Sequence, residues 1–551
     1  MALIHNPVLP GFHGDPSIIR VGKDYYMTTS SFEWFPGGPL YHSRDLIHWE
    51  LLYNILSTTR KLNLVGVQPS FGVWAPDLSL NPATGRIYLL YSNVHCRNKW
   101  FFDVDNYLIW TDDIRSQVWS DPIYVNSSGF DASLFHDDDG RAWVVNKDRD
   151  FRPRNVDRRT ITLQEFDLDR GQLIGKARQI TSGATERRFV EGPHLYKHDG
   201  MYYLLTAEGG TGYGHCVALL RSASIEGPYV PSPYGPVLTG QDKEFSGTES
   251  VPFMMMDKYN PNTHLQKCGH GCLVETQTGE FFIAHLCGRP VMPRQRCILG
   301  RETAIQRVSW TGDGWLTMQH GCLARTEVEG PHLPEHPFPA QAEHVDFRRD
   351  ALPPFFYTPR NEFSESWVSL SRKKGRLSLL GRESLTSNYF PSLIARKLTA
   401  FHAQATTCMH FSPEQYHHLA GLAVFYDMHN HHTAFKTYDE DFGGVHLSVA
   451  SFIDSKLVMS DTHVPVSADA PVWLRAEIHD LSLKFMYSLD GASFLPLGEE
   501  LDMAPLSDEE SPNGSFTGTF VGLFAQDSYA KQKWAEFDWF ELKTLDEERV
   551  P

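Results

Sequence analysis

The feature that most constrains the fold is a pattern that recurs five times in the first three fifths of the chain. In four copies a head residue lies nine positions before a turn glycine, and an aromatic residue follows the glycine. The first copy is shorter by two, with Asp15 before Gly22. The other heads and their glycines are Pro76 and Gly85, Asp131 and Gly140, Glu191 and Gly200, and His270 and Gly279. Each copy is typical of a β-hairpin made of a short apolar strand, a polar turn and an aromatic strand.

The recurrence predicts a five-bladed β-propeller. Repeats of about 40–60 residues made only of strands are typical of propellers, in which each blade is one four-stranded sheet. A second hairpin follows each head hairpin, for example at residues 41–52, 107–125 and 303–318. The strand nearest the axis comes first in each blade, so we expect the five heads to converge at one end of the central channel. Two aspartates, a glutamate and a histidine would then share one concave site.

The rest of the chain predicts a second all-β domain. At 551 residues the chain is too long for one ordinary core. We assign residues 1–325 to the propeller and residues 326–358, which are rich in proline and lack alternation, to an extended linker. From residue 359 to 551 alternating strands return without the head pattern, and frequent turn signals favour a β-sandwich of jelly-roll type.

Charge and composition exclude some classes of partner. The 50 basic and 67 acidic residues give a net charge of −17, which argues against nucleic acid and favours a neutral or cationic ligand. The N-terminus lacks the features of a signal peptide, and no apolar stretch is long enough for a membrane span. Without an export signal, the eight scattered cysteines are expected to be reduced thiols. We therefore expect a cytoplasmic protein.

The convergence of carboxylates indicates catalysis. Burying like charges together is costly unless at least one group stays protonated, so a fold tolerates it mainly where a function needs it. Glycoside hydrolysis needs such a set, because one carboxylic acid protonates the departing oxygen and another carboxylate activates water or attacks the sugar. Asp15, Asp131 and Glu191 are therefore the candidate catalytic residues.

Several motifs in matching order resemble glycoside hydrolase family 43, and most closely its two-domain β-xylosidases. They include GFHGDPS, GVWAPDLSL, FDASLFHDDDGRAW, VEGPHLYKHDG and LGRETAIQ, and the resemblance covers nearly the whole chain. It implies an enzyme that inverts the anomeric centre, with Asp15 as general base, Glu191 as general acid, and Asp131 orienting the acid and raising its pKa. The chain departs from the family in GFHGDPS, where Asn-Pro usually precedes Asp-Pro, so contacts near His13 are expected to differ.

Aromatic residues near the blade heads are candidates for the pocket wall. Phe32 and Trp74 can stack on a pentose face or simply belong to the core, and the pattern leaves both open. Phe130 precedes Asp131 and should line the same wall. Phe516 lies in a sandwich segment, SFTGTFVGLF, which resembles one that inserts an aromatic ring into the propeller mouth.

By the same resemblance, Arg301 in GRETAI is the substrate-binding arginine, able to donate two hydrogen bonds to sugar hydroxyls. Arg289 in CGRP is its nearest competitor. We expect an exo-β-1,4-xylosidase that acts on xylobiose and short xylo-oligosaccharides, and that forms a homodimer or homotetramer. An α-L-arabinofuranosidase on the same scaffold is the first alternative. A carbohydrate-binding propeller without catalysis is disfavoured by the three carboxylates.

Metal binding is not required by this chemistry. In related enzymes a histidine at the position of His270 can hold a calcium ion with water ligands, and a hydrogen bond from His270 to Asp131 or to water is the alternative. The CGHGC segment (268–272) is a poor zinc pattern, because strand alternation separates its ligands by only two residues. The histidines of MHNHH (428–432) are expected to be solvated.

Overall fold

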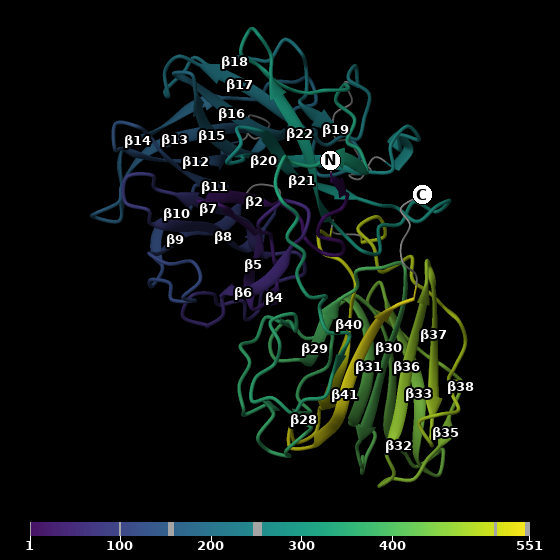
Figure 1. The fold of residues 1–551 in the computed structure, drawn as a ribbon. Coiled ribbons are helices and arrows are strands. Elements are labelled where there is room, and N and C mark those ends of the chain that lie inside the picture. Colours follow the sequence, from purple (N-terminus) through teal and green to yellow (C-terminus); the bar gives the residue numbers. More distant parts are fainter. Residues whose placement is uncertain (1, 99–100, 153–158, 246–255, 512–514, 546–551) are drawn as a thin grey trace.

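The computed structural model describes residues 2–98, 101–152, 159–245, 256–511 and 515–545. These residues form an all-β protein with two domains, a five-bladed propeller and a β-sandwich beside it (Figure 1). Within them the helical structure is one short 3₁₀ turn, η1 (Met256–Lys258). The described part of the chain therefore has no helix of the length and apolarity needed to span a membrane. The all-β prediction and the propeller prediction are confirmed.

Each blade is a sheet whose strands follow one another in chain order. The fourth sheet carries one additional strand, β19, on β17. Blade one contains β2 (Ser17–Val21), β3 (Asp24–Thr28), β5 (Gly37–Ser43) and β6 (Glu50–Leu56), and blade two contains β7 (Gly72–Leu80), β8 (Ile87–Arg97), β9 (Phe102–Thr111) and β10 (Ile123–Asn126). Blade three contains β11 (Gly129–His136), β12 (Ala142–Arg149), β13 (Arg159–Asp167) and β14 (Gln172–Thr181). Blade four contains β15 (Glu191–His198), β16 (Met201–Glu208), β17 (Cys216–Ser222), β18 (Val230–Pro231) and β19 (Leu238–Thr239), and blade five contains β20 (Gln266–Glu275), β21 (Phe281–Gly288), β22 (Glu302–Trp310) and β23 (Leu316–Met318).

The first strand of every blade lies next to the axis. β11 contacts β7 and β15, and β2 contacts β7 and β20, so these five strands surround the channel. Apolar side chains on both faces of the blade strands fill the spaces between neighbouring sheets; the consecutive residues Leu89, Leu90 and Tyr91 of β8, for example, are fully buried. Burial on both faces of each sheet explains why the strands are so rich in aromatic and β-branched residues.

Two sheets form the sandwich. The nine-stranded sheet is built on the path β27-β28-β41-β30-β36-β37-β38, and the seven-stranded sheet on the path β29-β40-β31-β32-β33-β34. The strands of the first sheet are β25 (His344–Val345), β27 (Val368–Ser369), β28 (Leu377–Leu380), β30 (His402–His410), β36 (Val472–His479), β37 (Ser482–Ser488), β38 (Leu495–Pro496), β39 (Leu501–Asp502) and β41 (Trp534–Thr544). Those of the second are β29 (Ser392–Lys397), β31 (His418–Asp427), β32 (Asn430–Asp439), β33 (Gly444–Ile453), β34 (Lys456–Met459), β35 (Val464–Pro465) and β40 (Phe520–Asp527).

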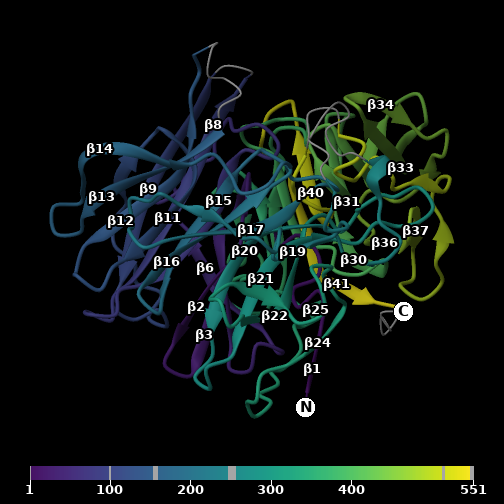
Figure 2. The same ribbon diagram turned by 90° about the horizontal axis from the view of Figure 1, so that it is seen from above.

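An aromatic core joins the two domains beside the channel mouth. It contains Phe12, Phe32 and Trp74 from the propeller together with Phe516 and Phe520 from the sandwich. In the same cluster the rings of Trp34 and Phe520 are stacked with centroids 3.5 Å apart. Viewed from above, β40 and β31 lie on the side of the sandwich that faces the propeller (Figure 2). The sandwich is therefore packed against the site-bearing end of the propeller and is not a distant appendage.

The segment between the domains is extended and pairs locally with both. β24 (Glu327–Glu329) pairs with β1 (Leu3–His5), β25 pairs with β41, and β26 (Thr358–Pro359) pairs with β4 (Trp34–Phe35). The sequence predicts that this segment is a linker. The pairings hold parts of it against one domain and then against the other.

The prediction that the histidines of residues 428–432 are solvated is wrong for two of them. His431 and His432 are 6% and 2% exposed, because strand β32 lies inside the seven-stranded sheet. The ring nitrogens of His432 face the Ser451 hydroxyl at 2.8 Å and the Asp502 carbonyl at 3.1 Å.

Candidate active site

A backbone irregularity recurs at the head of each innermost strand. The ladder register shifts after Trp74 in β7, after Phe130 in β11, after Glu191 in β15 and around Gly269 in β20. At each head one residue has a left-handed backbone: Asp15 (φ 54°), Ala75 (36°), Asp131 (52°), Gly192 (53°) and His270 (49°). Bulges of this kind re-aim side chains and are common beside active sites.

The bulges correct the predicted alignment of two blades. The left-handed residues are Ala75 in blade two and Gly192 in blade four, so the predicted heads Pro76 and Glu191 are each displaced by one residue. The predicted heads were found by counting nine positions back from the turn glycine. In these two blades the hairpin differs by one residue in length from those of blades three and five, so the count falls one residue away from the left-handed position. Glu191 therefore stands one position before the bulge of β15, whereas Asp131 stands on the bulge of β11 and Asp15 has the same left-handed backbone just before β2.

All the predicted site residues line one cavity at the channel mouth, with a volume of about 420 Å³. Its lining residues are Asp15, Phe32, Trp74, Arg97, Asn98, Phe102, Phe130, Asp131, Arg149, Glu191, Gly210, Thr211, His270, Arg301 and Phe516. All five blades contribute a titratable or aromatic side chain to the lining, and the sandwich contributes Phe516. His13 does not belong to this cavity; its Nε2 lies 2.6 Å from the Tyr41 hydroxyl in blade one.

Asp15 is held on both carboxylate oxygens. The Ser30 hydroxyl donates to Oδ2 at 2.7 Å, and Nδ1 of His270 lies 3.3 Å from Oδ1. Burial lowers the pKa of His270 to about 4. The imidazole is thus neutral near pH 7 and must carry its proton on Nδ1 to donate to the carboxylate. The carboxylate beside His270 is therefore that of Asp15, whereas the sequence offered Asp131 or water as an alternative to a metal ion.

Asp131 shares its environment with two other carboxylates. The backbone N–H of Gly192 donates to Oδ2 of Asp131 at 3.0 Å, which ties it to the residue after Glu191. Burial raises the pKa of Asp131 well above its usual range, and the nearby charges of Glu191 and Asp15 raise it further. Like charges in one dry pocket cannot all ionise, so the Asp131–Glu191 pair retains a proton at neutral pH.

The aromatic wall is one continuous group around Trp74. Its ring lies edge-on to Phe130, Phe516 and Phe32, with centroids 5.4, 5.9 and 6.1 Å away. The indole N–H donates to the Ser70 carbonyl at 2.9 Å, and the Ser70 hydroxyl accepts from the Phe516 N–H at 2.8 Å. Trp74, Phe32 and Phe516 are thus both core residues and cavity walls, and the stacking of Phe32 and Trp74 on a sugar ring stays a prediction.

Arg301 is anchored by the sandwich. Its Nε donates to Asp508 at 3.3 Å, its Nη2 donates to the Thr211 hydroxyl at 3.1 Å, and its guanidinium lies 4.4 Å from the Phe516 ring centroid. The competing arginine, Arg289, instead forms two hydrogen bonds with Glu302, at 2.8 and 2.9 Å. Of the two, only Arg301 lines the cavity.

Asp508 is the centre of a buried interdomain network. Besides Arg301, it accepts from the Lys267 ammonium at 3.2 Å and from the Tyr426 hydroxyl at 2.9 Å. Lys267 also pairs with Glu509. Two cations and two carboxylates thus balance one another in the dry interface, which is the condition under which buried charges are tolerated.

Comparison with known proteins agrees with this architecture. The model of glycosyl hydrolases family 43 matches residues 4–316, and the β-xylosidase C-terminal concanavalin A-like domain matches residues 344–543. The chain belongs to glycoside hydrolase family 43. It is 39% identical to "Xylan 1,3-beta-xylosidase" of Vibrio sp over 98% of both chains, and 40% identical to "Xylosidase/arabinosidase 43B" of Humicola insolens over 98% of this chain and 97% of that one. The crystal structure of xylan beta-1,4-xylosidase from Bacillus halodurans C-125 superposes with a TM-score of 0.92 at 43% identity, covering 98% of this chain and 100% of that one.

Other residues of the family 43 pocket were not predicted from the sequence. Arg97, Asn98, Phe102 and Arg149 line the cavity from the β8–β9 hairpin and the end of β12. Phe102 packs against Phe130 with ring centroids 5.1 Å apart. Arg97 and Arg149 end the second strands of their blades and Phe102 begins the third strand of blade two, where no repeat position marks them.

The donor set around His270 fits a metal poorly. Calcium takes six to eight oxygen ligands. Among the described residues, the His270 ring lies beside one oxygen of Asp15, and the ring of His194 is 6.3 Å away. A cation bound here by a family 43 enzyme would be held mostly by water. A different group, Cys408, His410 and Asp538 in the sandwich, has ligand atoms close enough together to hold a metal ion.

Proposed function

We propose that this protein is an exo-acting β-1,4-xylosidase that releases xylose from the non-reducing end of xylobiose and short xylo-oligosaccharides, with inversion of configuration. The observation that carries the proposal is the convergence of Asp15, Asp131 and Glu191 in one cavity, closed on one side by Phe516 of the sandwich. Family membership and the names of the full-length relatives support the β-xylosidase assignment.

In this mechanism Asp15 is the general base. Both of its oxygens are held, by Ser30 and by neutral His270, so the carboxylate is oriented before the substrate arrives. It takes a proton from a water molecule on one face of the terminal xylose while that water attacks the anomeric carbon. An inverting enzyme needs about 6.5–9.5 Å between the two carboxyl groups to leave room for the water, and this separation of Asp15 and Glu191 stays a prediction.

Glu191 is the general acid, and Asp131 keeps it protonated. The two carboxyls hold one proton between them, which Glu191 delivers to the glycosidic oxygen as the bond to the leaving xylose breaks. Arg301 donates to sugar hydroxyls, and Trp74 and Phe32 contact the apolar face of the ring. A cavity closed on one side by another domain admits a chain end, which favours exo action.

The experiment is a pair of measurements on the purified enzyme. The first compares β-1,4-xylobiose with β-1,3-xylobiose, and an aryl β-xyloside with an aryl α-L-arabinofuranoside. The second follows the anomeric proton of released xylose by NMR during turnover. Initial α-xylose supports the proposal. Initial β-xylose contradicts the mechanism, and exclusive use of the 1,3-linked disaccharide contradicts the linkage.

An α-L-arabinofuranosidase activity on the same site is the second candidate. It is supported by the relative from Humicola insolens, whose name gives both activities. A hydrated calcium ion beside His270 is a further proposal, which a loss of activity on dialysis against a chelator, restored by calcium alone, would support.

A further inference from the structure

The outer face of the nine-stranded sheet carries a group of side chains that the proposed reaction does not use. Ala403, Ala405 and Met409 of β30 belong to the sandwich core, so the alternate residues of this strand point outward. Cys408 and His410 are two of these outward residues, and both lie on the same face two positions apart. Cys408 is 2% exposed, whereas the side chain of His410 is 25% exposed.

A bulge in the neighbouring strand brings a carboxylate between them. Cys408 is paired with Trp539 and Met409 with Phe537, so Asp538 is the extra residue of β41 at this point. Phe537 and Phe540 both belong to the core, which leaves Asp538 and Trp539 on the outer face. Bulges commonly re-aim a side chain for a function.

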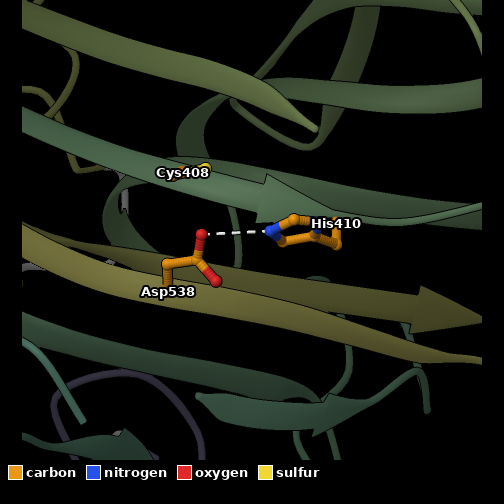
Figure 3. A group of neighbouring side chains, drawn as sticks. All are labelled: Cys408, His410 and Asp538. Carbon is orange, nitrogen blue, oxygen red and sulfur yellow. Dashed lines mark hydrogen bonds and ion pairs between the residues drawn. The ribbon is translucent and has the colours of Figure 1, made fainter. Parts of the chain in front are cut away.

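The three side chains converge on one point (Figure 3). Nε2 of His410 lies 3.0 Å from Oδ2 of Asp538, and one ligand atom from each of the three residues lies within 4.8 Å of the other two. Nitrogen, sulfur and oxygen ligands bound to one zinc ion at about 2.0–2.3 Å are separated by comparable distances. Small side-chain rotations therefore suffice to enclose an ion.

The charges around the group are also compatible with a divalent cation. Arg376 forms an ion pair with Oδ1 of Asp538 at 2.6 Å, which leaves Oδ2 directed at His410. One thiolate and one carboxylate would neutralise the ion, and Arg376 would act as the outer partner that fixes the carboxylate. Binding requires the Cys408 thiol to release its proton to solvent, so affinity should rise with pH.

We propose that Cys408, His410 and Asp538 form a zinc site that fastens the C-terminal strand β41 to β30, with water as the fourth ligand. A mixed thiolate, imidazole and carboxylate set favours zinc over calcium or magnesium, which prefer oxygen ligands alone. Three protein ligands and a partly exposed edge leave the fourth position open to solvent. The site lies in the sandwich and is independent of the proposed xylosidase chemistry.

The test measures metal binding directly on the full-length protein. After treatment with a chelator and dialysis, zinc is added and bound metal is counted by mass spectrometry; cobalt(II) is added in parallel and its absorption is recorded. One zinc per chain is expected, together with a near-ultraviolet thiolate-to-cobalt band and a higher melting temperature, since a ligand that binds only the folded state stabilises it. Cys408→Ser should abolish the band, and it should weaken zinc binding by more than about 100-fold, because outer partners alone contribute 10–100-fold.

Two further variants keep the result interpretable. His410→Gln changes a partly exposed side chain, so it should fold and still lose zinc. Cys96→Ser removes an exposed thiol in the propeller and should change nothing. The proposal is overturned if the wild-type protein binds no zinc at micromolar concentration, or if zinc and cobalt bind equally well to Cys408→Ser and His410→Gln.

Discussion

Replacing Asp508 by asparagine should damage catalysis although Asp508 does not line the cavity. The residue is 1% exposed, and its side chain accepts hydrogen bonds from Arg301, Lys267 and Tyr426. Asparagine keeps the shape but removes the charge that holds the Arg301 guanidinium in place. Hydrogen bonds to charged groups contribute about 1.5–3 kcal/mol. If that loss falls on the transition state, kcat/KM for xylobiose should decrease by roughly 10- to 150-fold.

The assay needs a control that separates positioning from general destabilisation. Asp502→Asn removes another ion pair between the domains, that of Asp502 with Arg294, whose side chains are 48% and 47% exposed. Exposed pairs contribute about 0–1 kcal/mol, so this variant should keep nearly all of its activity and stability. Unchanged kcat/KM in Asp508→Asn, with only a lower melting temperature, would refute the argument that the sandwich positions Arg301.

Four other substitutions test the site. Glu191→Ala should slow the hydrolysis of xylobiose far more than the hydrolysis of an aryl xyloside with a good leaving group, and equal effects on the two substrates would contradict its role as the acid. Asp15→Ala should slow the hydrolysis of both substrates to a similar extent. Where proton transfer matters, the rate should fall by about 10²–10⁴-fold in either variant. Burial raises the pKa of Asp131, so the folded state keeps a proton that the unfolded chain releases above about pH 4. The free energy of unfolding should therefore fall as the pH rises from about 4 towards the pKa of Asp131 in the folded protein, and the melting temperature of Asp131→Asn should depend less on pH. The same pH dependence of the melting temperature in both proteins between pH 4 and 8 would contradict this. Phe516→Ala removes the ring beside Arg301 and should raise KM by roughly 2- to 30-fold, since a cation–π contact contributes about 0.5–2 kcal/mol, while Tyr529→Ala on the exposed sandwich surface should not change KM.

The hairpins were predictable because they are local. About fifteen consecutive residues are enough to identify a short strand, a glycine turn and an aromatic strand, and five repetitions identify a propeller. The convergence of Asp15, Asp131 and His270 follows from the same repetition. The one-residue displacement of Glu191 does not, because a bulge depends on how a strand pairs with its neighbour and leaves no mark in the spacing.

Long-range partners were out of reach for a different reason. Asp508 and Arg301 are 207 residues apart and belong to different domains, so nothing in either neighbourhood marks the other. The choice between Arg301 and Arg289 likewise rested on resemblance until Glu302 was seen to engage Arg289. The burial of His432 could not be predicted either, because a run of histidines has no alternation of polar and apolar residues to indicate that its strand lies inside a sheet.

The left-handed backbone at positions 15 and 131 restricts which acid can stand there. Aspartate and asparagine tolerate this conformation better than other side chains, for which it costs about 1–2 kcal/mol. Glu191 precedes Gly192, and the glycine takes the left-handed position instead, so the longer acid sits on ordinary backbone. Exchanging aspartate for glutamate at 15 or 131 would thus shift the carboxyl and strain the main chain together. A library that randomises the three acids should recover glutamate readily at 191 alone.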